Sequence, residues 1–351
     1  MLALAARQSG LIPLVIDLYA DQDTRAISEA VCQVDALDEQ SLRAALDDIL
    51  GRFLVTLAIY GSGLESSPGC VEILEQTFEL LGNDYATFLK VQNKRLFFEL
   101  LSRFGVPFPE VVYGRPRSRA DWLIKPFQGE GGAGISCFAG QPVIGKAVYW
   151  QKAIEGISGS ALFLANGQGG ARLIGFNTQW CSGTEPDSEF IFAGIINNSP
   201  LSLEQEQRVG KWIQVLIGAY ALKGLNTLDF IVQDDKVFVL EINPRPSASL
   251  QLYGSDLLLM HIDACYGRLE RTFVSVPGFC GFQIVYADAT LRISEHFQWP
   301  EECADLPAPG LIIRKGRPIC SIIARDKSLQ RVYEKLMKTQ QIIVNQIQEG
   351  H

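Results

Sequence analysis

Two acidic residues and an asparagine near residue 240 have types and a spacing suited to holding a metal ion. Asp229 interrupts one apolar run, and Glu241 and Asn243 lie in the next, within the stretch from Leu240 to Pro246. Because side chains alternate along a strand, Glu241 and Asn243 share one face. A polar turn of three residues, Asp234 to Lys236, would place Asp229 directly opposite Glu241. Facing carboxylates repel unless a cation lies between them, and three oxygen ligands suit Mg²⁺.

The predicted hairpin also has an apolar face and a basic neighbour. Phe238, Leu240 and Ile242 are expected on the face opposite to Glu241. Arg245 follows the hairpin closely, and a guanidinium group holds a phosphate or a carboxylate in bidentate fashion. An ordinary surface hairpin with solvated acids explains each residue taken singly. The combination favours a metal and phosphate site.

The acid in the first strand and the Glu-x-Asn-Pro-Arg end of the second resemble the metal-binding hairpin of the ATP-grasp enzymes. This resemblance implies that Asp229, Glu241 and Asn243 hold the Mg²⁺ or Mn²⁺ ions that bridge the ATP phosphates. It also implies that Glu241, Asn243 and Arg245 are catalytic, with Arg245 near the transferred phosphate or the acyl substrate.

A helix is predicted over residues 92 to 104, and it ends at Gly105, which prolines follow. Lys94 at the head of this helix, with Gly-Val-Pro after it, resembles the opening of the ATP-grasp core. The resemblance implies that Lys94 reaches an ATP phosphate. A solvated helix lysine is the alternative.

Glycines at positions 129, 131 and 134 give a Gly-x-Gly-x-x-Gly pattern. A dinucleotide-binding fingerprint must open a helix, but Ile135 to Phe138 are β-branched or apolar, so we predict strand, glycine loop, strand. With the strand Trp122 to Pro126 before it, the segment resembles the ATP-grasp phosphate lid. Glycine backbone can approach phosphates closely. The resemblance implies ATP contacts from Lys125, Gly129, Gly131 and Gly132.

Residues 148 to 156 are similar to the ATP-grasp segment that joins the two lobes and contacts the nucleoside. The resemblance places Gln151, Lys152 and Ile154 beside the adenine and Glu155 beside the ribose. Many members of the family have an acid where Gln151 stands, so the chain departs from the family pattern there.

The composition bounds the class of protein. Hydrophobic residues make up 47% and charged residues 20% of the 351 positions, as in soluble globular proteins of two or three domains. The net charge of −8 and pI near 5.1 give no support for nucleic-acid binding. No apolar run approaches the roughly 18 residues of a membrane span. Eight scattered cysteines and three histidines argue against a zinc site or a disulfide scaffold and favour a reducing cytoplasm.

We predict an α/β protein of three parts. A small Rossmann-like domain is expected over residues 1–88, a two-lobed α+β ATP-grasp domain over 89–270, and a β-rich domain with a final helix over 271–351. In the first part, residues 14–17 and 53–60 are predicted as buried parallel strands with a helix over 39–50 between them. The turn from Gly61 to Glu65 is either a ligand loop or a tight connection, Cys137 and Cys265 are expected in the core, and His261 is expected to be structural.

The first residues depart from the family. A strand and a glycine-bearing turn open the N-terminal domain of ATP-grasp proteins, whereas this chain opens in a helix-like stretch, Leu2 to Gln8. Without that strand, a gap between neighbouring strands is expected. A start codon placed too far downstream is our first explanation, and divergence is the second.

The resemblance implies an ATP- and Mg²⁺-dependent ligase that joins a carboxylate to an amine through an acyl phosphate and releases ADP and phosphate. The chain is similar to the ATP-grasp group of predicted carboligases and tyramine–glutamate ligases, so an amino-acid substrate is expected. A bicarbonate-dependent carboxylase and an inactive nucleotide-binding regulator are the alternatives. The expected partners are small-molecule carboxylates and amines, with no nucleic acid and no membrane. A homodimer is compatible with the resemblance.

Overall fold

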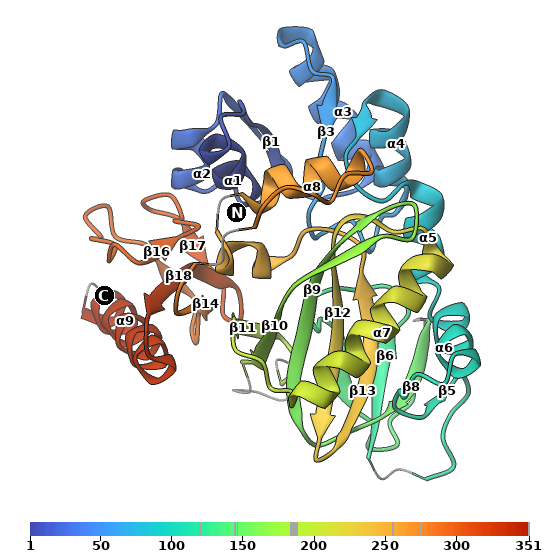
Figure 1. Cartoon of the computed structure of the whole chain (residues 1–351). Coiled ribbons are helices and arrows are strands. Elements are labelled where there is room, and N and C mark those ends of the chain that lie inside the picture. The colour runs from blue at the N-terminus through green and yellow to red at the C-terminus, as the bar shows by residue number, and fades with distance from the viewer. Residues whose placement is uncertain are drawn as a thin grey trace.

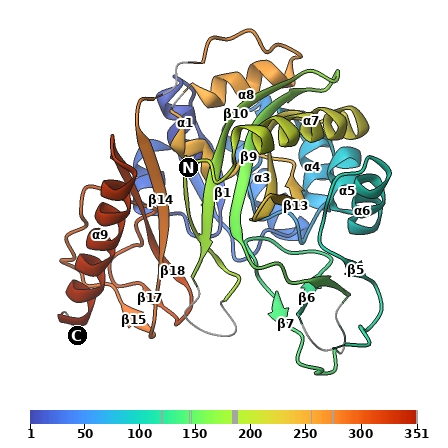
Figure 2. The same ribbon diagram turned by 60° about the horizontal axis from the view of Figure 1, so that its bottom comes forward.

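A long antiparallel β-sheet, with a smaller sheet against it, forms the centre of the molecule (Figures 1 and 2). The computed structural model describes residues 1–118, 121–143, 145, 147–182, 189–254, 256–273 and 276–349. Among these residues, no helix combines the length and the apolar character needed to cross a bilayer.

The N-terminal region, blue in Figure 1, contains short strands and helices. Its elements are α1 (Leu2–Gln8), β1 (Leu14–Asp17), α2 (Gln22–Ile27), β2 (Ala30–Gln33), α3 (Glu39–Arg52), β3 (Leu57–Ala58), α4 (Gly69–Thr77), β4 (Glu79–Leu80) and α5 (Tyr85–Gln92). β1 pairs with β2 and β3 pairs with β4, both in parallel. Among the described residues, β1 and β3 have no pairing with each other, so this region holds two separate two-stranded sheets.

Two details of this region differ from the prediction. The strand expected over residues 53–60 is limited to Leu57–Ala58, because α3 continues to Arg52 and the chain after it finds only the two-residue β4 as a partner. Leu54 is 97% exposed as a result. β1 is half-buried along its length instead of buried, since it pairs on one side only.

A four-stranded antiparallel sheet with the order β5-β8-β6-β7 follows. It contains β5 (Val111–Val112), β6 (Trp122–Pro126), β7 (Ser136–Cys137) and β8 (Val148–Lys152), preceded by α6 (Lys94–Arg103). Asn93 caps α6, accepting a hydrogen bond from Leu96 N, and Gly105 follows the helix with a positive φ of 65°. The glycine run lies between β6 and β7, so the predicted arrangement of strand, loop and strand is confirmed.

The large sheet has eight strands in the order β13-β12-β9-β10-β11-β14-β18-β16. Its first part contains β9 (Ile157–Asn166), β10 (Ala171–Cys181), β11 (Phe192–Ile196), β12 (Lys223–Gln233) and β13 (Lys236–Asn243), with α7 (Leu203–Tyr220) between β11 and β12. A 3₁₀ turn (Ala248–Leu252) and α8 (Leu257–Cys265) lead to β14 (Phe279–Tyr286), β15 (Leu291–Arg292), β16 (Cys303–Ala304), β17 (Ile312–Ile313), β18 (Pro318–Asp326) and α9 (Leu329–Glu349).

The strands after residue 270 therefore extend the large sheet and do not form a sheet apart from it. β14 pairs with β11 on one side and with β18 on the other. Among the described residues of this part, the short β15–β17 pair alone is separate, and α9 packs on β14 and β18. The division into three domains stays a prediction.

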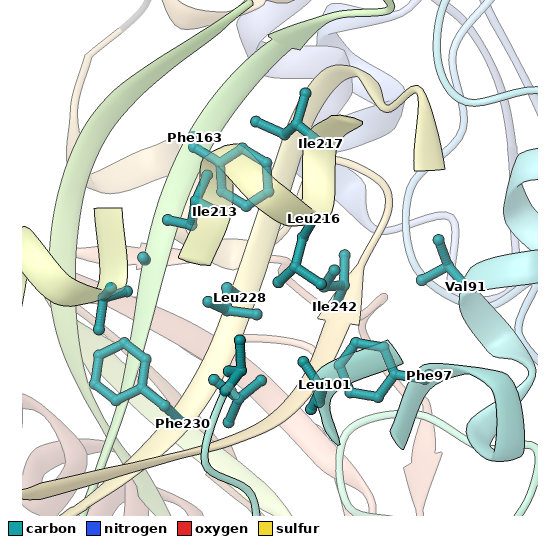
Figure 3. Close-up of a cluster of buried hydrophobic side chains, with 14 of the residues drawn as sticks. Val91, Phe97, Leu101, Phe163, Ile213, Leu216, Ile217, Leu228, Phe230 and Ile242 are labelled. Carbon is teal, nitrogen blue, oxygen red and sulfur yellow. The ribbon is translucent and has the colours of Figure 1, made fainter. Parts of the chain in front are cut away.

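The main apolar core lies between α7 and the large sheet and extends to α5 and α6 (Figure 3). α7 contributes Ile213, Leu216 and Ile217, while Phe163, Leu228, Phe230 and Ile242 come from the strands. Ser202 and Gln205 form a capping box at the start of α7, which fixes the helix start. This core holds one face of β12 and β13 in place, and the opposite face of the two strands carries the polar residues of the site.

Candidate active site

Asp229 on β12 lies directly opposite Glu241 on β13, as the sequence predicts, but for a different reason. The turn has two residues, Asp234 and Asp235, because Gln233 pairs with Lys236. A β-bulge then shifts the register between Asp229 and Phe230, so that Leu240 is the extra residue of β13.

The bulge also changes which side chains of β13 face the core. Val237, Val239 and Ile242 are buried in the main core, while Phe238 and Leu240 are half-buried. The prediction of Phe238, Leu240 and Ile242 on one face was therefore wrong, because the extra residue reverses the alternation once.

Asn243 completes the predicted metal trio. Its Nδ2 donates to Asp229 Oδ2 at 2.9 Å, and the other oxygen of Asp229, Oδ1, is buried and accepts no hydrogen bond from the described residues. The described residues contain no group of three or more His, Cys, Asp and Glu side chains that could hold a metal ion. The predicted trio is not such a group, because its third member is an asparagine. A buried carboxylate oxygen without a donor, next to a second acid, fits a hard cation such as Mg²⁺.

The two acids have opposite electrostatic environments. Burial and the negative charge of Glu241 raise the pKa of Asp229 to about 7. Burial also acts to raise the pKa of Glu241, but the positive charges of Lys94 and Lys125 outweigh it and lower this pKa to about 2. The two lysines thus keep Glu241 ionised. At Asp229 the positive charge of Arg245 is too weak to outweigh burial and the charge of Glu241.

Both predicted phosphate-binding lysines lie at this pair. Lys94 is only 7% exposed, and its Nζ donates to Glu241 Oε2 at 2.9 Å. Lys125 on β6 points to the same side as Tyr149 and Gln151, while Trp122 and Ile124 pack on the other side of the small sheet. Lys125 Nζ donates to Gln151 Oε1 at 3.0 Å, and burial lowers its pKa.

The four residues predicted near the nucleoside divide into two groups. Gln151 faces Lys125, and its Nε2 is buried without a partner among the described residues. Lys152 points to the other face of β8, where its Nζ lies 3.3 Å from Asp121 Oδ2 and over the ring of Trp122. Ile154 is half-buried and Glu155 is exposed, in the segment that joins β8 to β9. The side chain of Lys152 is therefore not brought to the cluster.

Arg245 lies beside the trio but has a partner that the sequence analysis did not name. Its Nε and Nη2 each lie 2.7 Å from Glu65 Oε1, in an ion pair whose two side chains are almost fully buried. Its Nη2 also lies 3.5 Å from Asn243 Oδ1. The guanidinium edge formed by Nε and Nη2 is thus occupied. Nη1 donates a long hydrogen bond of 3.5 Å to the Pro246 carbonyl, and its second N–H can serve a substrate oxygen.

The N-terminal region holds the chain between Asn243 and Arg245. Asn83 Nδ2 donates to the Pro244 carbonyl at 2.9 Å, and the hydroxyl of Tyr60 donates to the same oxygen at 3.3 Å. Asn83 also accepts from Lys223 N at the start of β12. Because these residues lie far from the hairpin in sequence and belong to no motif, nothing in the chain pointed to them.

The glycine loop contacts the large sheet. Phe192 N donates to the Gly131 carbonyl at 2.9 Å, and a Cβ on Gly132 would lie 1.8 Å from the Phe190 carbonyl oxygen. Gly131 and Gly132 also have positive φ values of 57° and 83°, so both positions require glycine. Glu130, between the glycines, is a second residue that the sequence analysis did not single out. Its Oε1 would lie 4.0 Å from a Cβ on Gly63, so the loop lies beside the N-terminal region.

His261 has a structural role, as predicted. It is fully buried, its Nδ1 accepts from Leu225 N at 2.8 Å, and its Nε2 lies 3.0 Å from the Leu81 carbonyl. Burial lowers its pKa to about 4. The placement of Cys137 in the core was wrong, because β7 is a short edge strand and this residue is exposed; Cys265 is half-buried.

Comparison with known proteins agrees with this arrangement. The family model of the ATP-grasp domain matches residues 91–249. An uncharacterized protein of Methanocaldococcus jannaschii is 22% identical over an alignment that covers 94% of this chain and 87% of the relative.

Solved structures share the fold. The biotin carboxylase domain of Hydrogenobacter thermophilus 2-oxoglutarate carboxylase, in complex with MgADP and bicarbonate, has a TM-score of 0.73 at 14% identity, covering 96% of this chain and 86% of that one. The N5-carboxyaminoimidazole ribonucleotide synthetase of Thermus thermophilus has a TM-score of 0.69 at 17% identity, covering 96% and 93%. The family match and the shared α/β fold thus show that the chain contains an ATP-grasp domain, the domain of ATP- and Mg²⁺-dependent enzymes, over residues 91–249.

Proposed function

We propose that this protein is a ligase that joins a carboxylate to an amine, with an amino acid as one substrate, and forms ADP and phosphate. The observation that carries the proposal is the convergence of Asp229 and Glu241 with Lys94 and Lys125 at the edge of the large sheet. Two acids that can bind a metal ion lie beside two lysines that can bind phosphate oxygens, and this combination supports phosphoryl transfer.

The proposed reaction has two steps. A carboxylate oxygen of the first substrate attacks the terminal phosphorus of ATP, and the bond to the bridging oxygen breaks to leave ADP. The nitrogen of the amine then attacks the acyl carbon, loses a proton, and expels phosphate. No covalent bond to the protein forms, so the chain needs no nucleophile of its own.

The side chains have separate tasks in this scheme. Asp229, Glu241 and Asn243 would hold Mg²⁺, which when bound offsets negative charge on the phosphates. Lys94 and Lys125 bind phosphate oxygens by charge-assisted hydrogen bonds. The Nη1 group of Arg245 stabilises the acyl phosphate, and the loop over Gly129, Gly131 and Gly132 excludes water from it. Gln151 and the backbone near Lys152, Ile154 and Glu155 bind the nucleoside.

A bicarbonate-dependent carboxylase is the second candidate, because the folds compared above include a biotin carboxylase domain and a carboxyaminoimidazole ribonucleotide synthetase. Bicarbonate can replace the organic carboxylate in the first step without any change in the metal and lysine residues. The two candidates therefore differ in the acyl substrate and not in the phosphoryl transfer.

One experiment separates the candidates. The protein is incubated with ATP, Mg²⁺ and a panel of amino acids and other carboxylates, with and without amines, and separately with bicarbonate. We expect ADP and phosphate with a matching carboxylate, transfer of ¹⁸O from that carboxylate to phosphate, and a hydroxamate when hydroxylamine is added. AMP and pyrophosphate as products would contradict the mechanism. ADP formation with bicarbonate alone would favour the carboxylase, and ATP binding without turnover would favour a regulator.

A further inference from the structure

The turn from Gly61 to Glu65, between β3 and α4, reaches the candidate site through one side chain. Glu65 is 2% exposed and Arg245 is 7% exposed, so their ion pair is shielded from water. Arg245 Nε donates to Glu65 Oε1 at 2.7 Å, and Arg245 Nη2 lies 2.7 Å from the same oxygen. The turn thus places a negative charge directly against a residue that the proposed function uses.

The turn is fixed by packing and by its own backbone. Leu64 is buried in the core that α3 and α4 share. Gly63 N donates to Glu65 Oε2 at 2.9 Å, and the positive φ of Gly63, 112°, favours glycine at this position. One oxygen of Glu65 is therefore held by the turn itself, and the other faces Arg245.

The orientation of the Arg245 side chain follows from this contact. The guanidinium group is planar and rigid, so that holding its Nε and Nη2 edge fixes the direction of Nη1. Nη1 donates a long hydrogen bond of 3.5 Å to the Pro246 carbonyl and keeps a second N–H for a substrate oxygen. Glu65 thus determines where this N–H points.

Arg245 without Glu65 would be a buried cation without a counter-ion. The other acceptors that the structure gives its guanidinium group are Asn243 Oδ1 and the Pro246 carbonyl, each 3.5 Å away. Asn243 belongs to the predicted metal trio and donates to Asp229. A guanidinium group released by Glu65 would therefore turn toward the trio. Burial acts to raise the pKa of Glu65, but the charge of Arg245 is the largest of the effects that outweigh it, and the lowered pKa keeps Glu65 ionised.

We propose that Glu65 is the positioning residue of Arg245, which holds Nε and Nη2 so that the guanidinium group stays off Asn243 and directs Nη1 to the acyl phosphate. This role of Glu65 rests on the role of Arg245 in the proposed function. The turn from Gly61 to Glu65 is then more than a tight connection and is not a ligand loop, because it orients a residue of the site. Arg245 offers the substrate one nitrogen and does not hold it in bidentate fashion.

The first test measures the exchange of the Arg245 Nε–H with water by ¹H–¹⁵N NMR, in the full chain without nucleotide. Arg245→Lys, which keeps the charge beside Glu65, identifies the signal. Glu65→Gln should speed the exchange by about tenfold or more, because a neutral amide oxygen is a weaker acceptor than a carboxylate. The exposed Glu72 on α4 provides the matched control, and Glu72→Gln should exchange as the wild type does. Equal exchange in Glu65→Gln and the wild type would overturn the proposal.

The second test separates position from charge. Glu65→Asp keeps a counter-ion for Arg245 but is one methylene shorter, so it draws the guanidinium group out of place while the protein stays folded. We expect kcat to fall by about tenfold or more, since small displacements of a catalytic group have effects of this size. The dissociation constant of Mg-ATP should stay unchanged, because Lys94 and Lys125 contact Glu241 and Gln151. A wild-type kcat in Glu65→Asp would mean that Glu65 supplies charge alone and would reject the positioning role.

A cycle with Arg245→Met shows whether Glu65 acts through Arg245. Turnover is measured at a temperature at which circular dichroism shows each variant folded. Glu65→Gln should lower kcat by about tenfold or more in the wild-type background and should lower it no further in Arg245→Met, which has no guanidinium group to orient. A further loss in the double variant would mean that Glu65 acts on the substrate itself, against the proposal.

These measurements distinguish a failure of the positioning role from a failure of the proposed function. The exchange experiment uses neither ATP nor substrates, and the turnover experiments use whichever carboxylate supports ADP formation, bicarbonate included. An exchange effect without any turnover would reject the ligase reaction and keep the hold of Glu65 on Arg245. ADP formation without an exchange effect would keep the reaction and overturn the positioning role.

Discussion

Asp229 and Glu241 face each other across β12 and β13 because one residue, Leu240, is inserted between Val239 and Glu241 in the pairing. A regular hairpin continued from the Gln233–Lys236 pair would set Leu240 against Asp229. The bulge removes Leu240 from the register and brings the second acid to the first. Bulges are frequent next to active sites because they redirect a side chain without changing the rest of the sheet.

Glu241→Gln should lose at least about a hundredfold in turnover while staying folded, because a neutral amide cannot replace a metal-binding carboxylate. The measurement is ATP-dependent ADP release under saturating Mg²⁺ with the substrate found in the screen above. Asp235→Asn, in the exposed turn of the same hairpin, is the matched control and should keep wild-type activity. Near-normal turnover in Glu241→Gln would reject the metal assignment.

Lys125→Met should weaken ATP binding by about 1.5–3 kcal/mol, roughly ten- to a hundredfold in the dissociation constant, since a charge-assisted hydrogen bond is lost. Isothermal titration of Mg-ATP measures this. Lys236→Met, an exposed lysine of the hairpin, should leave the constant unchanged. If Lys125→Met binds ATP as the wild type does, Lys125 contacts only Gln151 and has no role in nucleotide binding.

The acid pair, the trio and both lysines could be predicted because short motifs carry them. The hairpin has apolar runs on both sides of polar positions, Lys94 follows a helix cap, and Lys125 precedes a glycine run. Local sequence determines such features, and the structure brings Lys94, Lys125, Asp229, Glu241 and Asn243 together.

The bulge and the partners of Arg245 could not be predicted in the same way. A bulge leaves no mark in the alternation of β13, since Val237 to Ile242 reads equally well as a regular strand. Glu65 lies 180 positions before Arg245, and only the packing of the N-terminal region against the hairpin joins them. The length of β3 could not be predicted either, because it depends on the length of its partner strand β4, and strand pairing is set by the tertiary structure.

Asp229→Asn should stabilise the metal-free protein at high pH and leave it unchanged at low pH. The pKa of Asp229 is raised from 3.8 to about 7 in the folded state. Below the lower value both states are protonated. As the pH rises, the unfolded chain ionises first, so the wild type loses stability progressively until about pH 7. We expect a gain on the order of 4 kcal/mol for the variant near pH 8, since each pKa unit corresponds to about 1.4 kcal/mol, and almost none near pH 3.5 in urea unfolding. A gain that is the same at both pH values would contradict the account.

The loop from Gly129 to Gly134 should exchange its amides more slowly when ATP is bound. Four glycines leave the backbone free until phosphates accept its N–H groups, and we expect at least a several-fold decrease in exchange. Amides of α9, far along the chain from the lid, serve as the internal control. Equal exchange with and without ATP would mean that this loop does not close over the nucleotide.

Arg245 has two roles that a pair of variants can separate, one in the ion pair with Glu65 and one at the acyl phosphate. Arg245→Met alone leaves Glu65 buried without its cation, which should destabilise the fold by about 3–5 kcal/mol. Adding Glu65→Gln removes that unpaired charge, and its amide oxygen can still accept from Gly63 N, so most of the stability should return. Activity should not return, because the Nη1 donor is still missing where charge develops in the transition state, a loss of about a hundredfold or more. Urea unfolding and turnover of both variants give the answer. Recovery of turnover in the double variant would show that Arg245 acts only through its ion pair with Glu65.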